Sequence, residues 1–291
     1  MAHSGSKGGS GDRARALVAL ALSAALMHGC ARAQNEPAQG DAATTGSDAG
    51  SSAGICDGSD GIRLGMWSGG GFVSQEWLFM HPYGGAFAFV DGHCRFYAST
   101  NAMKSIATGS LTTAEAKQLA TEIGWAQIDA FSRHEDASCP DAGASMISNG
   151  VHAFGCSCGC DANAPAGLAA AEAASHVWTK RLAEQGTALD GAVRATLEAY
   201  GDGVAPGTLK WPLTRSASDF ISHGTLDASS GVVVDDTTQA AQLRMLRQLT
   251  LAQMPQAEAI QVDIGSSGTY TLLVRDELPA NVATAVAAFK H

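Results

Sequence analysis

The chain has 291 residues, of which 18 are basic and 28 are acidic, so its formal net charge at neutral pH is −10. No basic cluster offsets this charge, which argues against a nucleic-acid partner because phosphate binding depends on clustered Lys and Arg. The same balance disfavours adsorption to anionic lipid head groups and is typical of a protein that stays soluble outside the cytoplasm.

The N-terminal residues have the pattern of an export signal. Three basic residues come first, at Lys7, Arg13 and Arg15. The apolar run Ala16–Met27 follows, and its twelve residues are too few to span a bilayer but suit the hydrophobic region of a secretory signal peptide. The pattern predicts a signal peptide over residues 1–29, or over residues 1–33 if a later site is cut.

Two processing sites compete at the end of this signal. Met27-His28-Gly29-Cys30 resembles the lipobox of bacterial lipoprotein precursors, although that family usually has Leu at the position of Met27 and a small residue at that of His28. The resemblance implies that Cys30 is lipidated and becomes the new N-terminus. Ala31-Arg32-Ala33 is an ordinary signal-peptidase site, and cleavage there would discard Cys30 and release a soluble secreted protein.

The segment after the signal favours the lipidated form. Residues 34–54 contain no large aliphatic or aromatic side chain, so they cannot offset the entropy of ordering, and we predict a flexible tether over residues 30–54. A tether directly after the cysteine is the usual layout of bacterial lipoproteins. The resemblance covers residues 1–54 only and implies anchoring through an N-terminal lipid, at the outer membrane or in the periplasm or at the cell surface, and no particular activity.

Cysteine parity predicts disulfides in the exported chain. There are seven cysteines, and either cleavage removes Cys30 from the thiol pool. An even number of thiols remains, which in an oxidising compartment indicates up to three disulfides. The candidates are Cys56, Cys94, Cys139, Cys156, Cys158 and Cys160. We expect Cys56 to pair with Cys94, Cys139 to pair with one thiol of the Cys156–Cys160 segment, and the other two thiols to pair with each other.

The first folded region, residues 55–203, opens with strand and hairpin signals. Ile62–Trp67 is expected to form a strand, and Asp91-Gly92 suits a two-residue turn between Ala86–Val90 and His93–Ala98. In that register Phe89 faces Cys94. One face of the hairpin would then carry Phe87, Phe89, Cys94 and Phe96.

Helix signals follow in the same region. Thr112-Thr113-Ala114-Glu115 is a capping box that predicts a helix ending near Gly124. A long alanine-rich helix is expected from about Ala166. The spacing of Val193, Leu197 and Tyr200 predicts another helix that begins near Asp190.

The Cys156–Cys160 segment leaves its pairing open. A turn at Asn149-Gly150 would place Cys139 opposite Cys160, whereas Gly159 would instead allow a Cys158–Cys160 bond that leaves Cys156 for Cys139. A less favoured alternative is capture of Cu(I) or Zn(II) by the thiols of Cys156, Cys158 and Cys160. A straight strand separates residues four apart by about 13 Å, so a shared metal would require the chain to bend.

The second region, residues 207–291, is expected to begin after the glycine-rich stretch 201–207. Its predicted elements are strands at Thr208–Leu213 and Gly231–Val234, a helix after Asp235-Asp236-Thr237, a hairpin of Ile260–Ile264 with Thr269–Arg275, and a helix after Pro279. The first of these helices would bury Leu243, Leu246 and Leu249. Arg275-Asp276-Glu277, at a strand end, would form a local salt bridge. Both regions are α+β, with small mixed hairpin-and-helix organisation, and disulfides stabilise the first.

The sequence carries little catalytic signal. It has no H-E-x-x-H motif and no phosphate-loop or dinucleotide-binding glycine pattern in a strand-to-helix context, so we assign no catalytic residue and no cofactor. We expect an extracytoplasmic, lipid-anchored bacterial envelope protein that acts as a binding or structural module, with a protein or small molecule as its ligand. The alternative is an exported hydrolase whose site is assembled from scattered residues.

Overall fold

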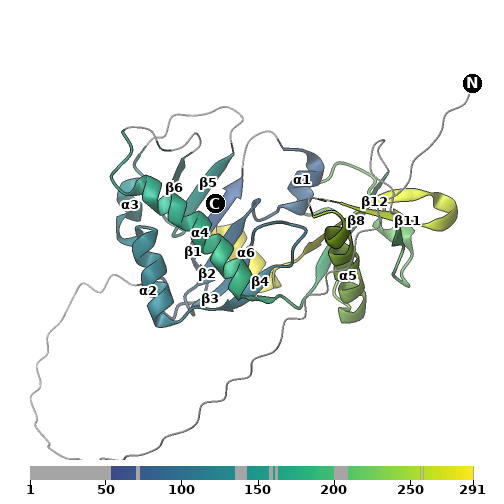
Figure 1. Ribbon diagram of the computed structural model, residues 1–291, viewed down its shortest axis with the longest axis horizontal. Coiled ribbons are helices and arrows are strands. Elements are labelled where there is room, and N and C mark those ends of the chain that lie inside the picture. The colour runs from purple at the N-terminus through teal and green to yellow at the C-terminus, as the bar shows by residue number, and fades with distance from the viewer. Residues whose placement is uncertain are drawn as a thin grey trace, which may run out of the picture. The chain divides into compact units, whose positions relative to one another are not determined.

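The structure is a computed structural model (Figure 1). It describes residues 54–69, 73–134, 143–156, 160, 163–199, 209–255, 257 and 259–290. The expected signal peptide, Cys30 and all of the expected tether except Gly54 lie outside these residues, as do Cys139 and Cys158.

The described residues form an α+β protein with two β-sheets, which confirms the predicted fold class. The strands of the first sheet are β1 (Ile62–Gly69), β2 (Phe87–Asp91), β3 (Arg95–Ser99), β4 (Ala107–Ser110), β5 (Ala144–Ser148), β6 (Ala153–Cys156) and β7 (Thr187–Ala188). Those of the second are β8 (Val193–Ala199), β9 (Leu209–Lys210), β10 (Val232–Val234), β11 (Ile260–Asp263) and β12 (Thr269–Asp276). The α-helices are α1 (Gln75–Met80), α2 (Thr113–Glu122), α3 (Ile128–Phe131), α4 (Leu168–Gln185), α5 (Thr237–Gln253) and α6 (Ala280–Phe289). Three short 3-10 helices complete the described elements: η1 (Trp125–Gln127), η2 (Ala217–Phe220) and η3 (Gly265–Ser267).

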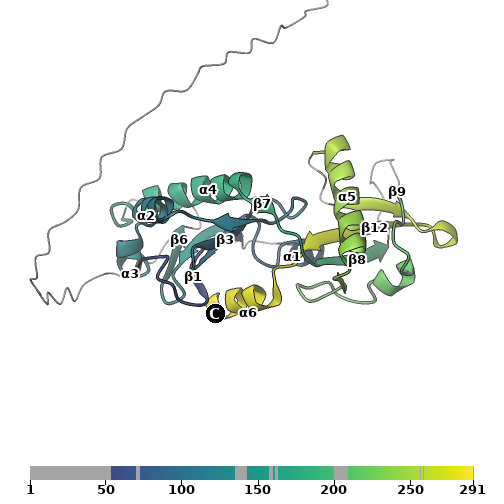
Figure 2. The same ribbon diagram turned by 90° about the horizontal axis from the view of Figure 1, so that it is seen from below.

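The first sheet is antiparallel, with strand order β6-β5-β1-β2-β3-β4-β7, and is covered on both faces. One face packs against α2, α3 and α4, and the other packs against α6, as Figure 2 shows. The strand β2 is therefore buried at all five positions. The long α4 is anchored by Trp178, which is 1% exposed and donates from Nε1 to Glu122 Oε2 at 2.6 Å.

The helix boundaries in this region follow from their capping residues. Thr112 accepts a hydrogen bond from the Glu115 backbone, while the Glu115 carboxylate accepts from the Thr112 backbone, so the predicted capping box is confirmed. Gly124 takes a left-handed φ of 67° directly after α2, as expected for a residue that ends a helix. The long alanine-rich helix is also confirmed, as α4.

The second sheet has the order β10-β8-β12-β11-β9, and only the β11–β9 pair is parallel. The helix predicted from Asp190 is wrong, because Val193–Ala199 is the strand β8. Val193, Ala195 and Leu197 alternate along that strand, are fully buried, and lie in the core under α5. The spacing of these apolar residues fits both the helical period and the strand period. Because the segment pairs with β10 on one side and with β12 on the other, it forms a strand.

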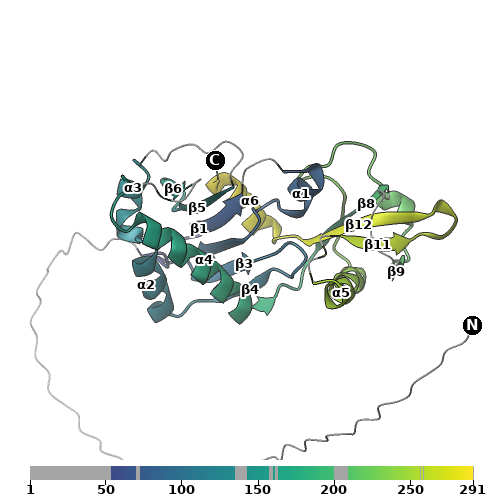
Figure 3. The same ribbon diagram turned by 45° about the horizontal axis from the view of Figure 1, so that its top comes forward.

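Helix α5 covers one face of the second sheet, and α1 lies on the opposite side (Figure 3). Asp236 caps α5 by accepting from the Gln239 backbone, as the acidic residues predicted. Leu243 and Leu246 are buried, but Leu249 is 44% exposed, so its predicted burial is wrong. Arg247 occupies the buried side instead, where it bonds Asp276.

Each sheet is partly covered by a helix that lies far from most of its strands in the chain. Helix α6, at the end of the chain, packs on the first sheet, whereas α1, from the start, belongs to the core of the second. Sheet membership changes between β7 and β8, at residues 189–192. The boundary that the sequence placed at 201–207 lies outside the described residues and stays a prediction. No helix in the described part of the chain has the length and apolarity needed to cross a membrane.

The hairpin at Asp91-Gly92 exists, but its register differs from the predicted one. Phe89 pairs with Tyr97, and Val90 with Phe96, so Phe96 lies on the face opposite Phe89. The loop between the last pair, Val90 with Phe96, therefore contains residues 91–95 and is three residues longer than predicted. The Asp91 carboxylate stabilises it by accepting hydrogen bonds from the backbones at positions 93 and 95.

The second hairpin shows a similar shift. Ser148 pairs with Ala153, so the loop contains four residues, 149–152, rather than a two-residue turn. The Asn149 side chain accepts from the backbones of Val151 and His152, and this favours the wider loop. Cys156 consequently pairs with Ser145. The predicted register, on which the placement of Cys160 opposite Cys139 depended, is therefore wrong.

Candidate ligand cleft

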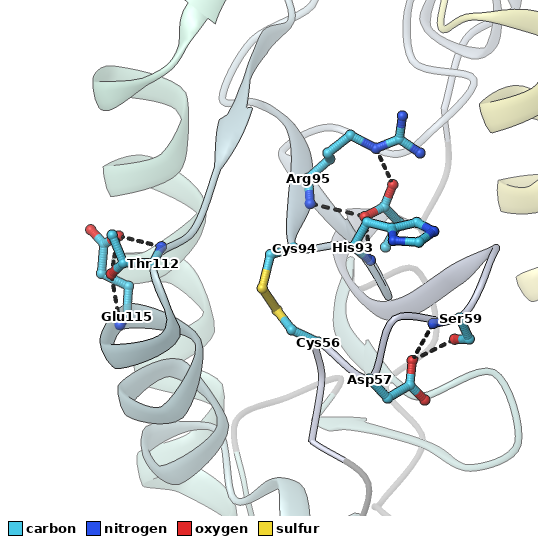
Figure 4. The surroundings of a disulfide bond; sticks show 9 residues. Cys56, Asp57, Ser59, His93, Cys94, Arg95, Thr112 and Glu115 are labelled. Atoms are coloured by element: carbon cyan, nitrogen blue, oxygen red, sulfur yellow. Dashed lines mark hydrogen bonds and ion pairs between the residues drawn. A yellow bond between two sulfur atoms is a disulfide. The ribbon is translucent and has the colours of Figure 1, made fainter.

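The Cys56–Cys94 disulfide is present as predicted, with a Cα–Cα distance of 5.0 Å (Figure 4). It joins the start of the described chain to the turn between β2 and β3, where Cys94 adopts a left-handed φ of 64°. Next to it, the Asp57 carboxylate accepts hydrogen bonds from the backbone and hydroxyl of Ser59, which lower the pKa of Asp57 below its usual value. These contacts hold residues 57–59 in a local turn.

The second disulfide joins Cys156 to Cys160, with a Cα–Cα distance of 5.1 Å. This pairing corrects both predicted alternatives, because Cys160 bonds neither Cys139 nor Cys158. Strand β6 ends at Cys156, so the chain is free to curl and the 13 Å separation of a straight strand does not apply. Cys158 lies outside the described residues.

The predicted thiolate metal site is not formed in this state, because Cys156 and Cys160 share a disulfide bond. Glu172, from α4, places Oε2 3.4 Å from Cys160 Sγ, so a carboxylate does lie beside the two sulfurs. The sulfur atoms carry no free thiolate while the bond is intact, and the arrangement is a structural cross-link at the end of β6.

Several concave sites occur among the described residues. The largest of these is an open groove of about 930 Å³ beside the Cys56–Cys94 disulfide, α2 and η1, and its lining includes Ile55, Lys117 and Trp125. None of its lining residues holds a buried polar side-chain atom that lacks a partner within the described chain. The groove therefore gives no chemical indication of what it would bind.

The second site, which we name the α1 cleft, has a volume of about 320 Å³. It lies between α1, the loop at residues 100–103, and the face of the second sheet opposite α5. It is lined by Ser74, Glu76, Trp77, Met80, His81, Gly85, Thr100, Asn101, Ala102, Met103, Ala259, Thr271 and Leu273. Small-molecule sites are of this size and combine apolar walls with a few placed polar groups.

The walls of the α1 cleft are aromatic and thioether side chains. The Trp77 indole stacks on the His81 imidazole, with ring centroids 4.4 Å apart and an interplanar angle of 15°. His81 is held through Nδ1, which lies 3.0 Å from the Trp77 carbonyl oxygen. Met80 and Met103 are buried at 5% and 1% exposure, so the ring pair is supported from the core of the second sheet.

Thr271, in the floor of the α1 cleft, belongs to a polar row across three strands. Thr271 on β12 pairs with Glu198 on β8 and with Gln261 on β11, and paired residues share one face of a sheet. The Gln261 amide donates from Nε2 to Thr271 Oγ1 at 3.2 Å. Glu198 Oε1 and Gln261 Oε1 are both buried, and neither accepts a hydrogen bond from the described residues.

Such orphaned acceptors are uncommon and costly. A buried polar atom without a partner costs about 1–3 kcal/mol, and most folded chains avoid it. Gln261 is 7% exposed, so its amide oxygen has little access to solvent. Glu198 and Gln261 are not among the lining residues of the α1 cleft, and neither oxygen atom is accessible, so the orphaned acceptors are a feature of the sheet beneath the cleft.

The carboxyl group of Glu198 also titrates abnormally. Burial raises the pKa of Glu198 above its usual value, a hydrogen bond with Ser222 lowers it, and the charge of Glu76 raises it further. Glu76 itself is exposed at the rim.

We expect Glu198→Gln to stabilise the chain at about pH 8. A carboxyl group whose pKa is higher in the folded state than in the unfolded state contributes to stability when the pH is below its unfolded-state pKa. That contribution is lost as the pH rises through the folded-state pKa. Glutamine removes the ionisation, so the gain should shrink as the pH falls to the ordinary glutamate pKa of 4.5 and below. Thermal unfolding followed by circular dichroism across this range measures the effect. The exposed Glu184→Gln on α4 is the matched control and should show no such pH dependence.

The structure also bears on the hydrolase alternative through one serine–histidine–aspartate cluster. His152 Nδ1 lies 3.4 Å from Ser132 Oγ, and His152 Nε2 lies 3.2 Å from Asp129 Oδ1. The Ser132 hydroxyl, however, donates to the Asp129 carbonyl at 2.9 Å, so its proton is directed away from the imidazole. Asp129 also pairs with Arg133. This cluster ties α3 to the second hairpin and is not arranged for nucleophilic attack.

Sequence reasoning missed the α1 cleft altogether. Its residues come from four segments that lie far apart in the chain, and no motif connects them. Of the five tryptophans, all of which lie in the described residues, only Trp178 is fully buried. The one available signal was the polar alternation of β8, which places Thr196 and Glu198 on a face away from α5.

Neither a protein-family model nor a curated protein nor a solved structure matches this chain.

Proposed function

We propose that this chain is an exported, lipid-anchored bacterial protein that binds a small molecule in the α1 cleft. The observation that carries the proposal is the lining of the cleft, in which the Trp77 indole and two buried methionines lie around the hydroxyl group of Thr271. Trp77 and the methionines supply the contact area, and the polar lining residues supply specificity. We favour binding over hydrolysis because Ser74, the serine in the lining, caps α1 by accepting a hydrogen bond from the Trp77 backbone.

The export and anchoring parts of the proposal rest on the sequence. The apolar run, Cys30 and the tether favour a lipidated N-terminus that would hold the folded region near a membrane. The Cys56–Cys94 and Cys156–Cys160 disulfides support an oxidising compartment, because cross-links of this kind do not persist in a reducing cytoplasm.

The lipid anchor is tested by metabolic labelling. We expect the wild-type chain expressed in a bacterium to incorporate labelled palmitate, and Cys30→Ala to lose the label entirely. A wild-type chain without label, or a label that survives the substitution, would contradict lipidation at Cys30. The mass of the mature chain then shows whether cleavage occurs after Ala33 instead.

Binding in the cleft is tested with methyl-labelled methionine. Met80 and Met103 line the α1 cleft, whereas Met245 is 52% exposed on α5 and Met66 is buried in the first sheet. A fragment library with equal numbers of cationic, neutral and anionic members is screened by methyl spectra. We expect some members to shift the signals of Met80 and Met103 and to leave those of Met66 and Met245 in place.

A filled cleft provides the control for this screen. Ala102→Leu adds a larger side chain at a partly buried lining position, and is expected to abolish the shifts at Met103 while the Met66 signal reports an intact first sheet. A complete library without shifts at Met80 and Met103, or shifts that persist in the filled variant, would overturn the proposed function.

A further inference from the structure

We propose that reduction of the Cys156–Cys160 disulfide converts this cross-link into a zinc site, with Cys156, Cys160 and Glu172 as its three protein ligands. The inference is independent of binding in the α1 cleft. Its basis is one cluster, in which the two sulfur atoms and a carboxylate oxygen of Glu172 all lie within 4.8 Å of one another. Among the residues that the structure describes, this is the one place where three groups of this kind meet at such distances.

The distances in this cluster suit a tetrahedral zinc ion. Zinc binds thiolate sulfur at about 2.3 Å and carboxylate oxygen at about 2.0 Å, so a sulfur and an oxygen ligand of one tetrahedron are about 3.5 Å apart. Glu172 Oε2 already lies 3.4 Å from Cys160 Sγ. Two sulfur ligands must be about 3.8 Å apart. Once the disulfide is broken, Cys156 Sγ and Cys160 Sγ can separate to that distance, because their Cα atoms are 5.1 Å apart.

Two of the three ligands are held by regular structure. Cys156 is the last residue of β6, where it pairs with Ser145 of β5, and it is 3% exposed. Glu172 lies on α4, which packs beside β6 (Figure 1), and its neighbour Ala171 is buried at 1% exposure. Ligands on strands and helices keep their positions better than ligands on loops. The site is therefore largely in place before a metal binds.

The Cys156–Cys160 disulfide is expected to be reduced more readily than Cys56–Cys94. Its sequence separation is four residues, against 38 for the other bond, and a short loop gains less stability from a cross-link than a long one. Cys160 is partly exposed, so a reductant can reach its sulfur atom. The reductant that the switch requires is a dithiol. It passes two electrons and two protons to the chain, which then carries two thiols, and it becomes a disulfide itself.

The chemistry of the ligand set selects zinc among the biological metals. Thiolate sulfur is a soft ligand, so Ca²⁺ and Mg²⁺, which take oxygen ligands, do not fit. Cu(I) also binds thiolates, but a carboxylate oxygen is a hard ligand that suits it poorly. Zn²⁺ binds both kinds of atom, and it forms sites with three protein ligands and a water molecule in the fourth position.

Electrostatics makes metal binding depend on the redox state. Ionising both thiols beside Glu172 would gather three negative charges in a partly buried cluster, which is unfavourable without a cation. Zinc forms two bonds to sulfur and one to oxygen, and it displaces the two thiol protons into solvent. In the oxidised chain these two sulfur atoms bond each other and offer no thiolate. The disulfide therefore acts as a switch that controls metal binding.

Zinc titration of the full-length mature chain tests the switch. A phosphine reduces the chain, since a thiol reductant would itself bind the metal, and a chromophoric chelator competes for zinc to give the dissociation constant. We expect the reduced chain to bind a single zinc ion and the oxidised chain to bind it at least about a hundredfold more weakly, because binding requires thiolates. Cobalt(II) is a second probe, and its sulfur-to-metal charge-transfer absorption should appear with the reduced chain only.

Variants identify the ligands. Glu172→Gln keeps the size of the side chain and should weaken zinc binding at least about tenfold, since the loss of a residue that merely orients a ligand already costs that much. Glu184→Gln, exposed on the same helix, is the matched control and should bind zinc as the wild type does. Cys156→Ser with Cys160→Ser should lose the cobalt absorption, although the phosphine also opens Cys56–Cys94 in that variant.

The other cysteines are removed in a further variant. Cys139→Ser with Cys158→Ser leaves the two proposed thiolate ligands and the Cys56–Cys94 pair, and it should still bind zinc when reduced. Circular dichroism with and without zinc shows whether each reduced variant is folded. We expect zinc to raise the midpoint of thermal unfolding of the reduced wild-type chain, because a ligand that binds only the folded state stabilises it.

Each contrary outcome overturns the zinc site. These outcomes are a reduced chain that binds no zinc or is unfolded even with zinc, a Cys156→Ser with Cys160→Ser variant that binds as tightly as the wild type, and loss of binding when Cys139 and Cys158 are replaced. Equal affinities of Glu172→Gln and Glu184→Gln would show that the carboxylate is not a ligand, which overturns the proposed ligand set. None of these results affects the proposed binding in the α1 cleft.

Discussion

Replacing Asp276 by asparagine is expected to lower the free energy of unfolding by about 3–5 kcal/mol. The Asp276 side chain is 0% exposed and accepts from Arg244 Nε at 2.8 Å and from Arg247 Nη2 at 3.0 Å. It also accepts from the Ile106 backbone at 3.0 Å. The amide removes the negative charge, which takes from Arg247 its buried carboxylate partner and leaves Arg244 with only the exposed Asp190 at 4.0 Å. Urea unfolding of the purified chain, followed by circular dichroism, measures the loss.

An exposed ion pair provides the matched control. Asp219 pairs with Arg215 at 3.1 Å, but both side chains are about half exposed, at 46% and 45%. Asp219→Asn should therefore cost no more than about 1 kcal/mol, because water and salt screen an exposed pair. Equal losses for the two variants would contradict the view that Asp276 is a buried counter-ion on which folding depends.

This network explains how the two sheets are joined. Asp276 lies at the end of β12 in the second sheet, yet it holds the backbone of Ile106 in the loop that leads into β4 of the first. Arg247 bonds both Asp276 and the Ser105 hydroxyl, so α5 takes part in the same contact. The sequence predicted only a local salt bridge here. Arg275 does pair with Glu277, but Asp276 points to the opposite face because neighbours in a strand alternate.

The elements that could be predicted are those whose signals are local. The capping box at Thr112 determines where α2 begins, and Asp236 does the same for α5. The hairpin of β11 and β12 and the helix after Pro279 also lie where the sequence placed them. In each case the deciding hydrogen bonds or turn residues lie within a few positions of one another, so a single sequence contains them.

The details that could not be predicted depend on contacts between distant segments. The Asp91-Gly92 pair indicates a turn, but the loop length is set by the Asp91 carboxylate and by the cross-link from Cys94 to Cys56. The spacing in Val193–Ala199 fits a helix, and only the pairing with β10 and β12 makes it a strand. Tertiary pairing therefore overrides the local pattern at these places.

The candidate site could not be predicted for a related reason. Glu198, Thr271 and Gln261 are neighbours only because three strands align in register, and α1 reaches them from a position more than a hundred residues earlier in the chain. No short motif can report such a convergence. What the sequence does contain is the composition of the row, since acidic and amide side chains inside otherwise apolar strands are unusual.

Removing the Cys56–Cys94 disulfide is expected to cost about 4 kcal/mol. The bond closes a loop with a sequence separation of 38 residues, and the chain-entropy relation for a loop of that length gives a loss near this value. The double variant Cys56→Ala with Cys94→Ala avoids a leftover thiol that could form a new pair. Urea unfolding without reductant is the measurement, with intact mass used to confirm that the other cysteines remain oxidised.

The Cys156–Cys160 bond provides the internal comparison, because its separation is only four residues. The same relation gives about 2 kcal/mol for a loop that short, so Cys156→Ala with Cys160→Ala should lose roughly half as much stability. The order of the two losses is the decisive result. Equal losses, or a larger loss for the short loop, would show that packing of Cys156, which is 3% exposed, outweighs chain entropy in this region. The expected order instead identifies the Cys56–Cys94 bond as the cross-link that holds the start of the folded region, where the tether would pull on it.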